Sequence, residues 1–162
     1  MPSYTTGDIR NVVFVGHGGS GKTSLIDAML TASGTIKHTV SVTDGSSASD
    51  FEKEEKEHGH SIYSALLHVD HLGKRINIID TPGSPDLIGH AIASMPAVET
   101  AVVVVNAQAG IEVVTRRMME IARSRNIPRA IVINRIDQPE LDLEALVGQI
   151  QDTFGLDRKS VV

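Results

Sequence analysis

Cysteine and tryptophan are both absent from this sequence of 162 residues, and aromatic residues make up only 3% of it. Without cysteine the chain has no disulfide bond and no thiolate metal site. The scarcity of aromatic side chains argues against a surface that stacks the bases of single-stranded nucleic acid. The formal net charge of -5 argues against a general polyanion-binding surface, so an anionic ligand requires a local site.

Long hydrophobic runs are lacking as well. Runs such as "AVVVVNA" are far shorter than the roughly 20 apolar residues that a membrane-spanning helix needs. The first residues, "MPSYTTGDIR", show no basic-then-apolar signal pattern. We therefore expect a cytoplasmic protein with no membrane partner and no sequence-specific DNA partner. Its length and its 41% hydrophobic content suit one domain with a single core.

Strand-like and helix-like segments alternate along most of the chain. Apolar spacing predicts strands at 10–15, in "KRINIID", in "TAVVVVNA" and in "PRAIVINR", and helices at 23–32, 87–95, 113–122 and in "LDLEALVGQIQDTFG". A hairpin is predicted from "SIYSALLHV" and "KRINIID". Residues 34–59 are predicted to form a long irregular connection, and "DRKSVV" is predicted to begin a further strand. We expect an α/β fold, a three-layer sandwich with a mixed, mostly parallel sheet.

A phosphate-binding motif lies between the first predicted strand and helix. Residues 16–23, "GHGGSGKT", match the pattern G-x-x-x-x-G-K-S/T. Its glycines let backbone N–H groups surround phosphate oxygens, Lys22 reaches the β and γ oxygens, and the Thr23 hydroxyl ligates Mg²⁺. The expected contacts come from Gly16, His17, Gly18, Gly19, Ser20, Gly21, Lys22, Thr23 and Ser24.

A second motif, "DTPG", follows the strand that ends at Asp80. By itself it also suits an ordinary turn with proline in its centre. Together with the phosphate loop, it predicts that Asp80 holds Mg²⁺ through water and that the Gly83 amide contacts the γ-phosphate. The expected contacts come from Asp80, Thr81, Pro82, Gly83 and Ser84.

The third motif, "NRID", follows the strand "AIVI" and bears on the choice between ATP and GTP. Asn134 can tie the base loop to the phosphate loop, and the Asp137 carboxylate can accept hydrogen bonds from guanine N1–H and its amino group. Adenine lacks this donor pair, so a buried carboxylate favours GTP and GDP. Arg135 and Ile136 complete the predicted base-binding segment. A P-loop ATPase or kinase is the alternative.

These segments together resemble the GTP-binding domain of translational GTPases, above all elongation factor G and elongation factor G-like proteins. The resemblance rests on "GHGGSGKTSL", "DFEKEEKEHGHSI", "INIIDTPGSPD", "AVVVVNAQAGIEVVTRR" and "PRAIVINRID". It implies a GTPase that converts GTP to GDP and phosphate with Mg²⁺, in the first domain of a multidomain factor acting on the ribosome in translocation or recycling. Residues 1–162 are then the GTP-binding domain, with a P-loop NTPase fold of the small GTPase-like kind. We expect this domain to be a C-terminally truncated fragment, monomeric or weakly associating. Which ribosomal task it performs is left open.

Four positions depart from the pattern that the resemblance implies. Ser84 stands where the family has a histidine that positions the attacking water, so we expect weak intrinsic hydrolysis. Ser61 replaces a threonine that closes over Mg²⁺, Arg135 replaces a lysine, and Gly19 replaces a frequent aspartate. The alternative to a GTPase is a nucleotide-dependent binding module with negligible hydrolysis.

The resulting hypothesis assigns roles to the site and to two mobile segments. The catalytic set is Lys22, Gly83 and Ser84, and the metal set is Thr23, Ser61 and Asp80. Segments 34–61 and 80–90 are expected to become ordered with GTP and Mg²⁺ and to relax when phosphate leaves. The acidic run "DFEKEEKEHGH" is expected to be a solvated face or a partner surface.

Overall fold

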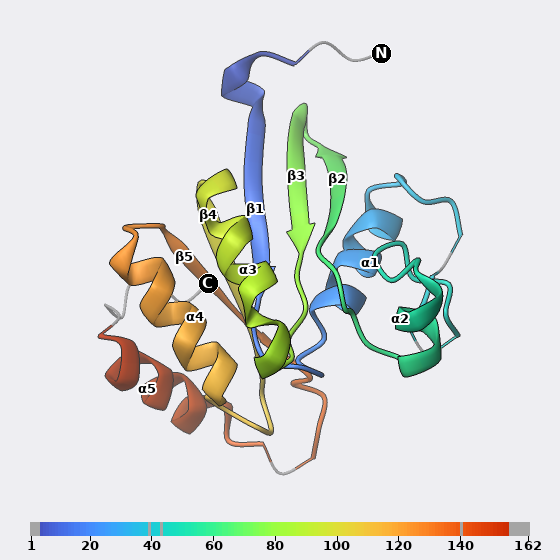
Figure 1. The fold of residues 1–162 in the computed structure, drawn as a ribbon. Coiled ribbons are helices and arrows are strands. Elements are labelled where there is room, and N and C mark those ends of the chain that lie inside the picture. The colour runs from blue at the N-terminus through green and yellow to red at the C-terminus, as the bar shows by residue number, and fades with distance from the viewer. Residues whose placement is uncertain (1–3, 39, 43, 140, 156–162) are drawn as a thin grey trace.

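A five-stranded sheet forms the centre of the molecule (Figure 1). The computed structural model describes residues 4–38, 40–42, 44–139 and 141–155. The strands are β1 (Ile9–Val15), β2 (Ala65–His71), β3 (Lys74–Asp80), β4 (Thr100–Asn106) and β5 (Arg129–Asn134). Their order is β2-β3-β1-β4-β5, in which β2 and β3 pair antiparallel and the other neighbours pair parallel. The predicted mixed, mostly parallel sheet and the predicted hairpin are confirmed.

Helices cover both faces of this sheet, as the three-layer prediction requires (Figure 1). They are α1 (Lys22–Ala32), α2 (Lys53–His58), α3 (Ile88–Ser94), α4 (Val113–Ser124) and α5 (Leu143–Phe154), with 3-10 turns η1 (Thr6–Asp8), η2 (Pro85–Leu87) and η3 (Met95–Ala97). Apolar residues of α3, α4 and α5 share one buried cluster with Val13 and Val103, whereas Ile26 and Leu30 of α1 pack with Phe14 and Val104. Neighbouring residues of β1 and β4 thus face opposite layers, as the two-residue period of a strand dictates.

The segment 34–59 was predicted to be irregular, and this prediction is wrong for part of it. Lys53–His58 forms α2, which ends at Gly59 in the left-handed conformation with φ 67°. Five of the six helix residues are exposed and only Glu55 is buried, so no apolar period marks the helix. The predicted further strand in "DRKSVV" lies outside the described residues.

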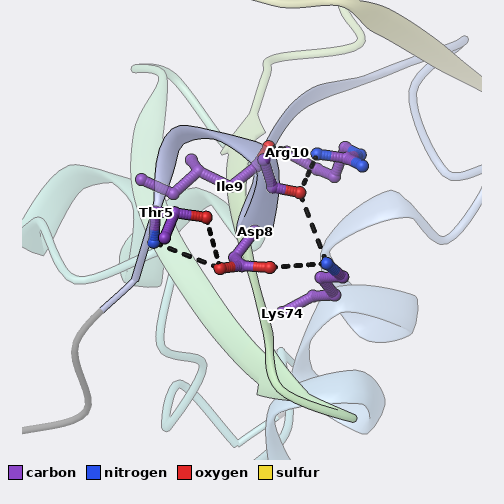
Figure 2. Close-up of polar contacts among 6 residues, drawn as sticks. Thr5, Asp8, Ile9, Arg10 and Lys74 are labelled. Carbon is purple, nitrogen blue, oxygen red and sulfur yellow. Dashed lines mark hydrogen bonds and ion pairs between the residues drawn. The ribbon is translucent and has the colours of Figure 1, made fainter.

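The starts of β1 and β3 are joined by a small polar cluster (Figure 2). The Asp8 carboxylate accepts hydrogen bonds from the Thr5 hydroxyl at 2.6 Å and from Lys74 Nζ at 2.6 Å. These contacts hold the pKa of Asp8 well below its usual range, with the Lys74 hydrogen bond the largest cause. The cluster lies at the end of the sheet opposite to the carboxyl ends of the parallel strands.

The carboxyl ends of the parallel strands meet at one edge. The register pairs Phe14 with Asp80 and Asn106 with Asn134. The loops that follow β1, β3 and β5 therefore leave the sheet at the same edge, where open α/β sheets bind their ligands. Membrane-spanning helices are absent from the described part of the chain, whose longest helices, α4 and α5, have 12 residues each.

Candidate nucleotide-binding site

The loop between β1 and α1 is shaped by glycine at positions where a side chain has no room. Gly16 has φ 144°, and a Cβ there would collide with the backbone oxygen of Val104. Gly21, with φ 89°, precedes the first residue of α1, and a Cβ there would collide with the Asn134 amide. The loop leads into the helix N-terminus, whose first N–H groups have no acceptor within the helix and attract anions.

Lys22 lies folded against this loop. It is 6% exposed, and its Nζ donates hydrogen bonds to the backbone oxygens of Gly16 and His17, each at 3.0 Å. Burial lowers the pKa of the Lys22 ammonium, and the carboxylates of Asp80 and Asp50 act in the opposite direction. The loop therefore holds a buried cationic side chain beside backbone groups suited to phosphate.

Asp80, at the end of β3, faces the start of α1. It is 1% exposed, and its Oδ2 accepts a hydrogen bond from the Thr23 hydroxyl at 2.8 Å. Burial raises the pKa of Asp80 to about 6, although the Thr23 hydrogen bond and the Lys22 charge lower it. Its second oxygen, Oδ1, is buried without a hydrogen-bond partner among the described residues. A buried carboxylate oxygen without a hydrogen-bond donor is stabilised by a bound cation.

Ser61 completes a group of oxygen atoms around Thr23. The hydroxyls of Ser61 and Thr23 lie 3.2 Å apart, and Ser61 Oγ donates to Asp50 Oδ1 at 2.7 Å. Hydroxyl and carboxylate oxygens are the ligands that Mg²⁺ prefers, usually completed by water and phosphate. The described residues contain no cluster of three or more His, Asp or Glu side chains suited to a metal. Thr23, Ser61 and Asp80 thus fit a Mg²⁺ ion that is shared with a phosphate ligand.

The turn after β3 packs directly on the phosphate loop. The Thr81 hydroxyl donates to the Phe14 backbone oxygen at 2.6 Å and anchors the turn beside β1. A Cβ on Gly83 would lie only 2.5 Å from Lys22 Nζ and 2.6 Å from the Gly18 nitrogen. This crowding requires glycine at position 83, and it places the next residues of the turn over the phosphate loop.

The predicted tie between the base loop and the phosphate loop is present. Asn134 Nδ2 donates to the Ser20 backbone oxygen at 2.9 Å across 114 residues of sequence. Arg135 follows in a left-handed conformation, φ 61°. Ile136 is 59% exposed and Asp137 is also exposed, so the prediction of a buried carboxylate is wrong for this structure. An exposed Asp137 can still face a purine that binds at the loop.

A cavity of about 530 Å³ lies between the phosphate loop, the segment around Ser61 and the turn after β3. Its lining comprises His17, Gly18, Gly19, Gly21, Lys22, Thr23, Ser24, Val42, Asp50, Gly59, His60, Ser61, Gly83, Ser84, Pro85 and Arg135. Of the other predicted residues, Gly16, Ser20, Asp80, Thr81 and Pro82 are buried, Asn134 is half-buried, and Ile136 and Asp137 are exposed outside the lining. The cavity thus brings together the phosphate loop, Ser61 and the turn at Ser84.

Two acidic residues of the site were missed from the sequence. Asp50 is buried, lines the cavity and accepts from Ser61, and burial raises its pKa. Glu112 precedes α4 and lies 3.5 Å from His17 Nε2. Asp50 opens the acidic run at 50–58, but nothing in that run distinguishes it from its solvated neighbours. Glu112 has no motif around it.

Comparisons with known proteins agree with this geometry. The family described as "Elongation factor Tu GTP binding domain" matches residues 7–161. An elongation factor G-like protein of Mycobacterium tuberculosis is 34% identical over 149 residues, which cover 92% of this chain and 21% of that protein. Peptide chain release factor 3 of Synechocystis is 32% identical over 156 residues, covering 94% of this chain and 28% of that protein.

A solved structure agrees as well. A crystal structure of a protein from Thermus thermophilus superposes with a TM-score of 0.87 at 33% identity, over 91% of this chain and 22% of that one. The chain therefore spans only 21% to 28% of the length of these three proteins.

Proposed function

This chain belongs to the family of elongation factor Tu GTP binding domains, and we propose that it binds GTP and GDP with Mg²⁺ and hydrolyses GTP slowly. The observation that carries the proposal is the cavity in which the phosphate loop, Ser61 and the turn at Ser84 meet. Buried Asp80 beneath it and the Asn134 contact to Ser20 connect that cavity to the predicted metal and base positions.

The proposed roles follow from the chemistry of each side chain. The phosphate loop and Lys22 hold the phosphate groups through N–H donors and positive charge. Thr23, Ser61 and Asp80 hold Mg²⁺, which neutralises charge on the phosphate oxygens when bound. Asp137 accepts from the guanine edge, and that contact favours guanine over adenine.

Hydrolysis is proposed to be slow because of the residue at position 84. Ser84 lines the cavity beside Gly83, where it can approach a terminal phosphate. Its hydroxyl is short and has no imidazole to exchange protons near neutral pH, so it positions a water molecule less effectively than histidine. The same observation favours a second candidate function, a nucleotide-dependent binding module that hydrolyses GTP negligibly.

The names of the related proteins point to the wider setting. They include an elongation factor G-like protein and peptide chain release factor 3, both named for steps of translation. We therefore propose the ribosome as the partner, the cytoplasm as the location, and residues 1–162 as the GTP-binding domain of a translation factor. Translocation and recycling are the two candidate tasks.

Phosphate release from GTP separates the two candidate functions. The chain would be assayed with Mg²⁺, alone and with ribosomes, beside a Lys22→Ala variant that lacks the buried cation. A GTPase predicts turnover above that of the variant and stimulation by ribosomes. Turnover equal to that of the variant in both conditions, in a chain that binds GTP, would support the binding module instead.

A further inference from the structure

Glu55 differs from every other residue of α2 because it is buried. Its exposed fraction is 2%, whereas the remaining residues of the helix, Lys53–His58, are exposed. Burying a carboxylate is costly unless hydrogen-bond donors surround it. The donors to Glu55 therefore show what this side chain stabilises.

The donors to the Glu55 carboxylate are backbone N–H groups. Glu55 Oε1 accepts from the N–H groups of Ile62 and Tyr63, each at 3.0 Å, and Oε2 accepts from that of Glu52 at 3.2 Å. The helix itself closes at Gly59, whose N–H donates to the Glu55 backbone oxygen at 2.8 Å. One carboxylate thus joins the start of α2 to the two residues that directly follow Ser61.

Ser61 in turn contacts the candidate metal site. Its hydroxyl donates to Asp50 at 2.7 Å and lies 3.2 Å from that of Thr23, which donates to Asp80. A contiguous series of contacts therefore runs from Glu55 through the backbone at 62–63 to the oxygens that fit Mg²⁺. Loss of the Glu55 carboxylate would leave the N–H groups of Glu52, Ile62 and Tyr63 without their acceptor. Water can satisfy the N–H groups of Ile62 and Tyr63 only if the loop moves outward.

We propose that Glu55 is a positioning residue that holds Ser61 in the metal site and so sets the Mg²⁺-dependent part of nucleotide affinity. The inference rests on the proposed function, since it deepens the role of the same site. Glu55 itself neither lines the cavity nor belongs to the predicted nucleotide contacts. Its effect therefore passes through the position of Ser61, and binding measured without Mg²⁺ is insensitive to it.

The test compares nucleotide affinity with and without the metal. Dissociation constants of a fluorescent GDP and a non-hydrolysable GTP analogue would be measured in Mg²⁺ and in EDTA for the wild type, Glu55→Ala, Glu55→Gln and Glu54→Ala. Because Glu55→Ala removes three hydrogen bonds to a charged acceptor, two of them from the residues after Ser61, it should lose about tenfold or more of the Mg²⁺ enhancement of nucleotide affinity. Its affinity in EDTA should stay within about twofold of wild type.

The two other variants serve as internal comparisons. Glu55→Gln keeps a carbonyl oxygen without the charge, so it should recover part of the enhancement. Glu54→Ala removes an exposed carboxylate from the same helix and should behave as wild type. Proteolysis of segment 34–61 in the presence of Mg²⁺ and nucleotide should be faster in Glu55→Ala than in Glu54→Ala.

Contrary outcomes fall into two distinguishable groups. A Glu55→Ala variant with full Mg²⁺ enhancement, or with equal losses in Mg²⁺ and EDTA, would overturn the positioning role and leave the proposed function intact. Equal losses of affinity in Mg²⁺ and in EDTA would indicate that Glu55 has a general structural role. A wild-type chain that binds neither nucleotide in either condition would overturn the proposed function and this inference together.

Discussion

Asp80 is a buried ionisable residue, and its titration makes the free energy of unfolding depend on pH. Its pKa of about 6 lies above the ordinary value of 3.8, mainly because of burial. Between these two values the native state binds a proton that the unfolded chain has released. The free energy of unfolding that Asp80 contributes therefore falls as the pH rises from about 4 to 6.

Replacement of Asp80 by asparagine should remove this dependence. In EDTA without nucleotide, Asp80→Asn should be more stable than the wild type at pH 7, by up to about 3 kcal/mol at about 1.4 kcal/mol per pKa unit. The difference should shrink to under about 1 kcal/mol at pH 4. Urea unfolding at several pH values measures it, with exposed Asp86→Asn as the control. A difference independent of pH would show that Asp80 is not the titrating group.

In the proposed function, base selection depends on Asp137. An asparagine at this position presents one donor and one acceptor group where the carboxylate accepts twice. Asp137→Asn should therefore reduce the preference for GDP over ADP by about tenfold or more. Competition binding measures this ratio, with Asp152→Asn on the exposed side of α5 as the control. An unchanged ratio would favour the ATPase or kinase interpretation.

Single residues were predictable from the sequence where a local motif defines them. Lys22, Thr23 and Asp80 lie together as their motifs predicted, and Asn134 contacts the phosphate loop. Asp50, Glu55 and Glu112 were not predicted, because their partners are set by the fold and not by neighbours in sequence. The expected burial of Asp137 was also wrong, because the exposure of a residue after a strand is set by the fold and not by its local motif.

At the scale of elements, the site depends on the close contact between the turn after β3 and the phosphate loop. A methyl group on Gly83 would enter the space held by Lys22 Nζ and the Gly18 backbone. Gly83→Ala should therefore displace one of these groups and weaken GDP binding by about tenfold or more.

A second glycine provides the matched comparison. Gly89 lies in α3 with open space around its Cβ position, so Gly89→Ala should keep wild-type affinity and should not lower stability. Nucleotide titration and thermal unfolding of both variants test the contrast. Equal affinity of Gly83→Ala and Gly89→Ala for GDP would contradict the proposed packing of the turn on the site.

Elements with a clear apolar period were predictable, and α2 was not. The strands and the helices α1, α3, α4 and α5 all bury apolar stripes, and the structure confirms them. Helix α2 is held by its capping residues and by buried Glu55, which leave no hydrophobic signal.

At the scale of the whole molecule, the sheet order explains why distant motifs form one site. Strand β1 lies at the centre between β3 and β4, with β5 beside β4. Parallel pairing brings the segments at 16–23, 80–84 and 134–137 to the same edge. The class of fold was predictable because it follows from alternating strands and helices, whereas the cavity depends on the packing of the long segment before β2.

The most direct test of the account is a titration of the chain with fluorescent GDP, a non-hydrolysable GTP analogue and an ATP analogue, each with Mg²⁺ and with EDTA. The account predicts binding of both guanine nucleotides, weaker binding in EDTA and much weaker binding of the ATP analogue. Equal binding of guanine and adenine nucleotides, or binding that ignores Mg²⁺, would contradict the proposed site.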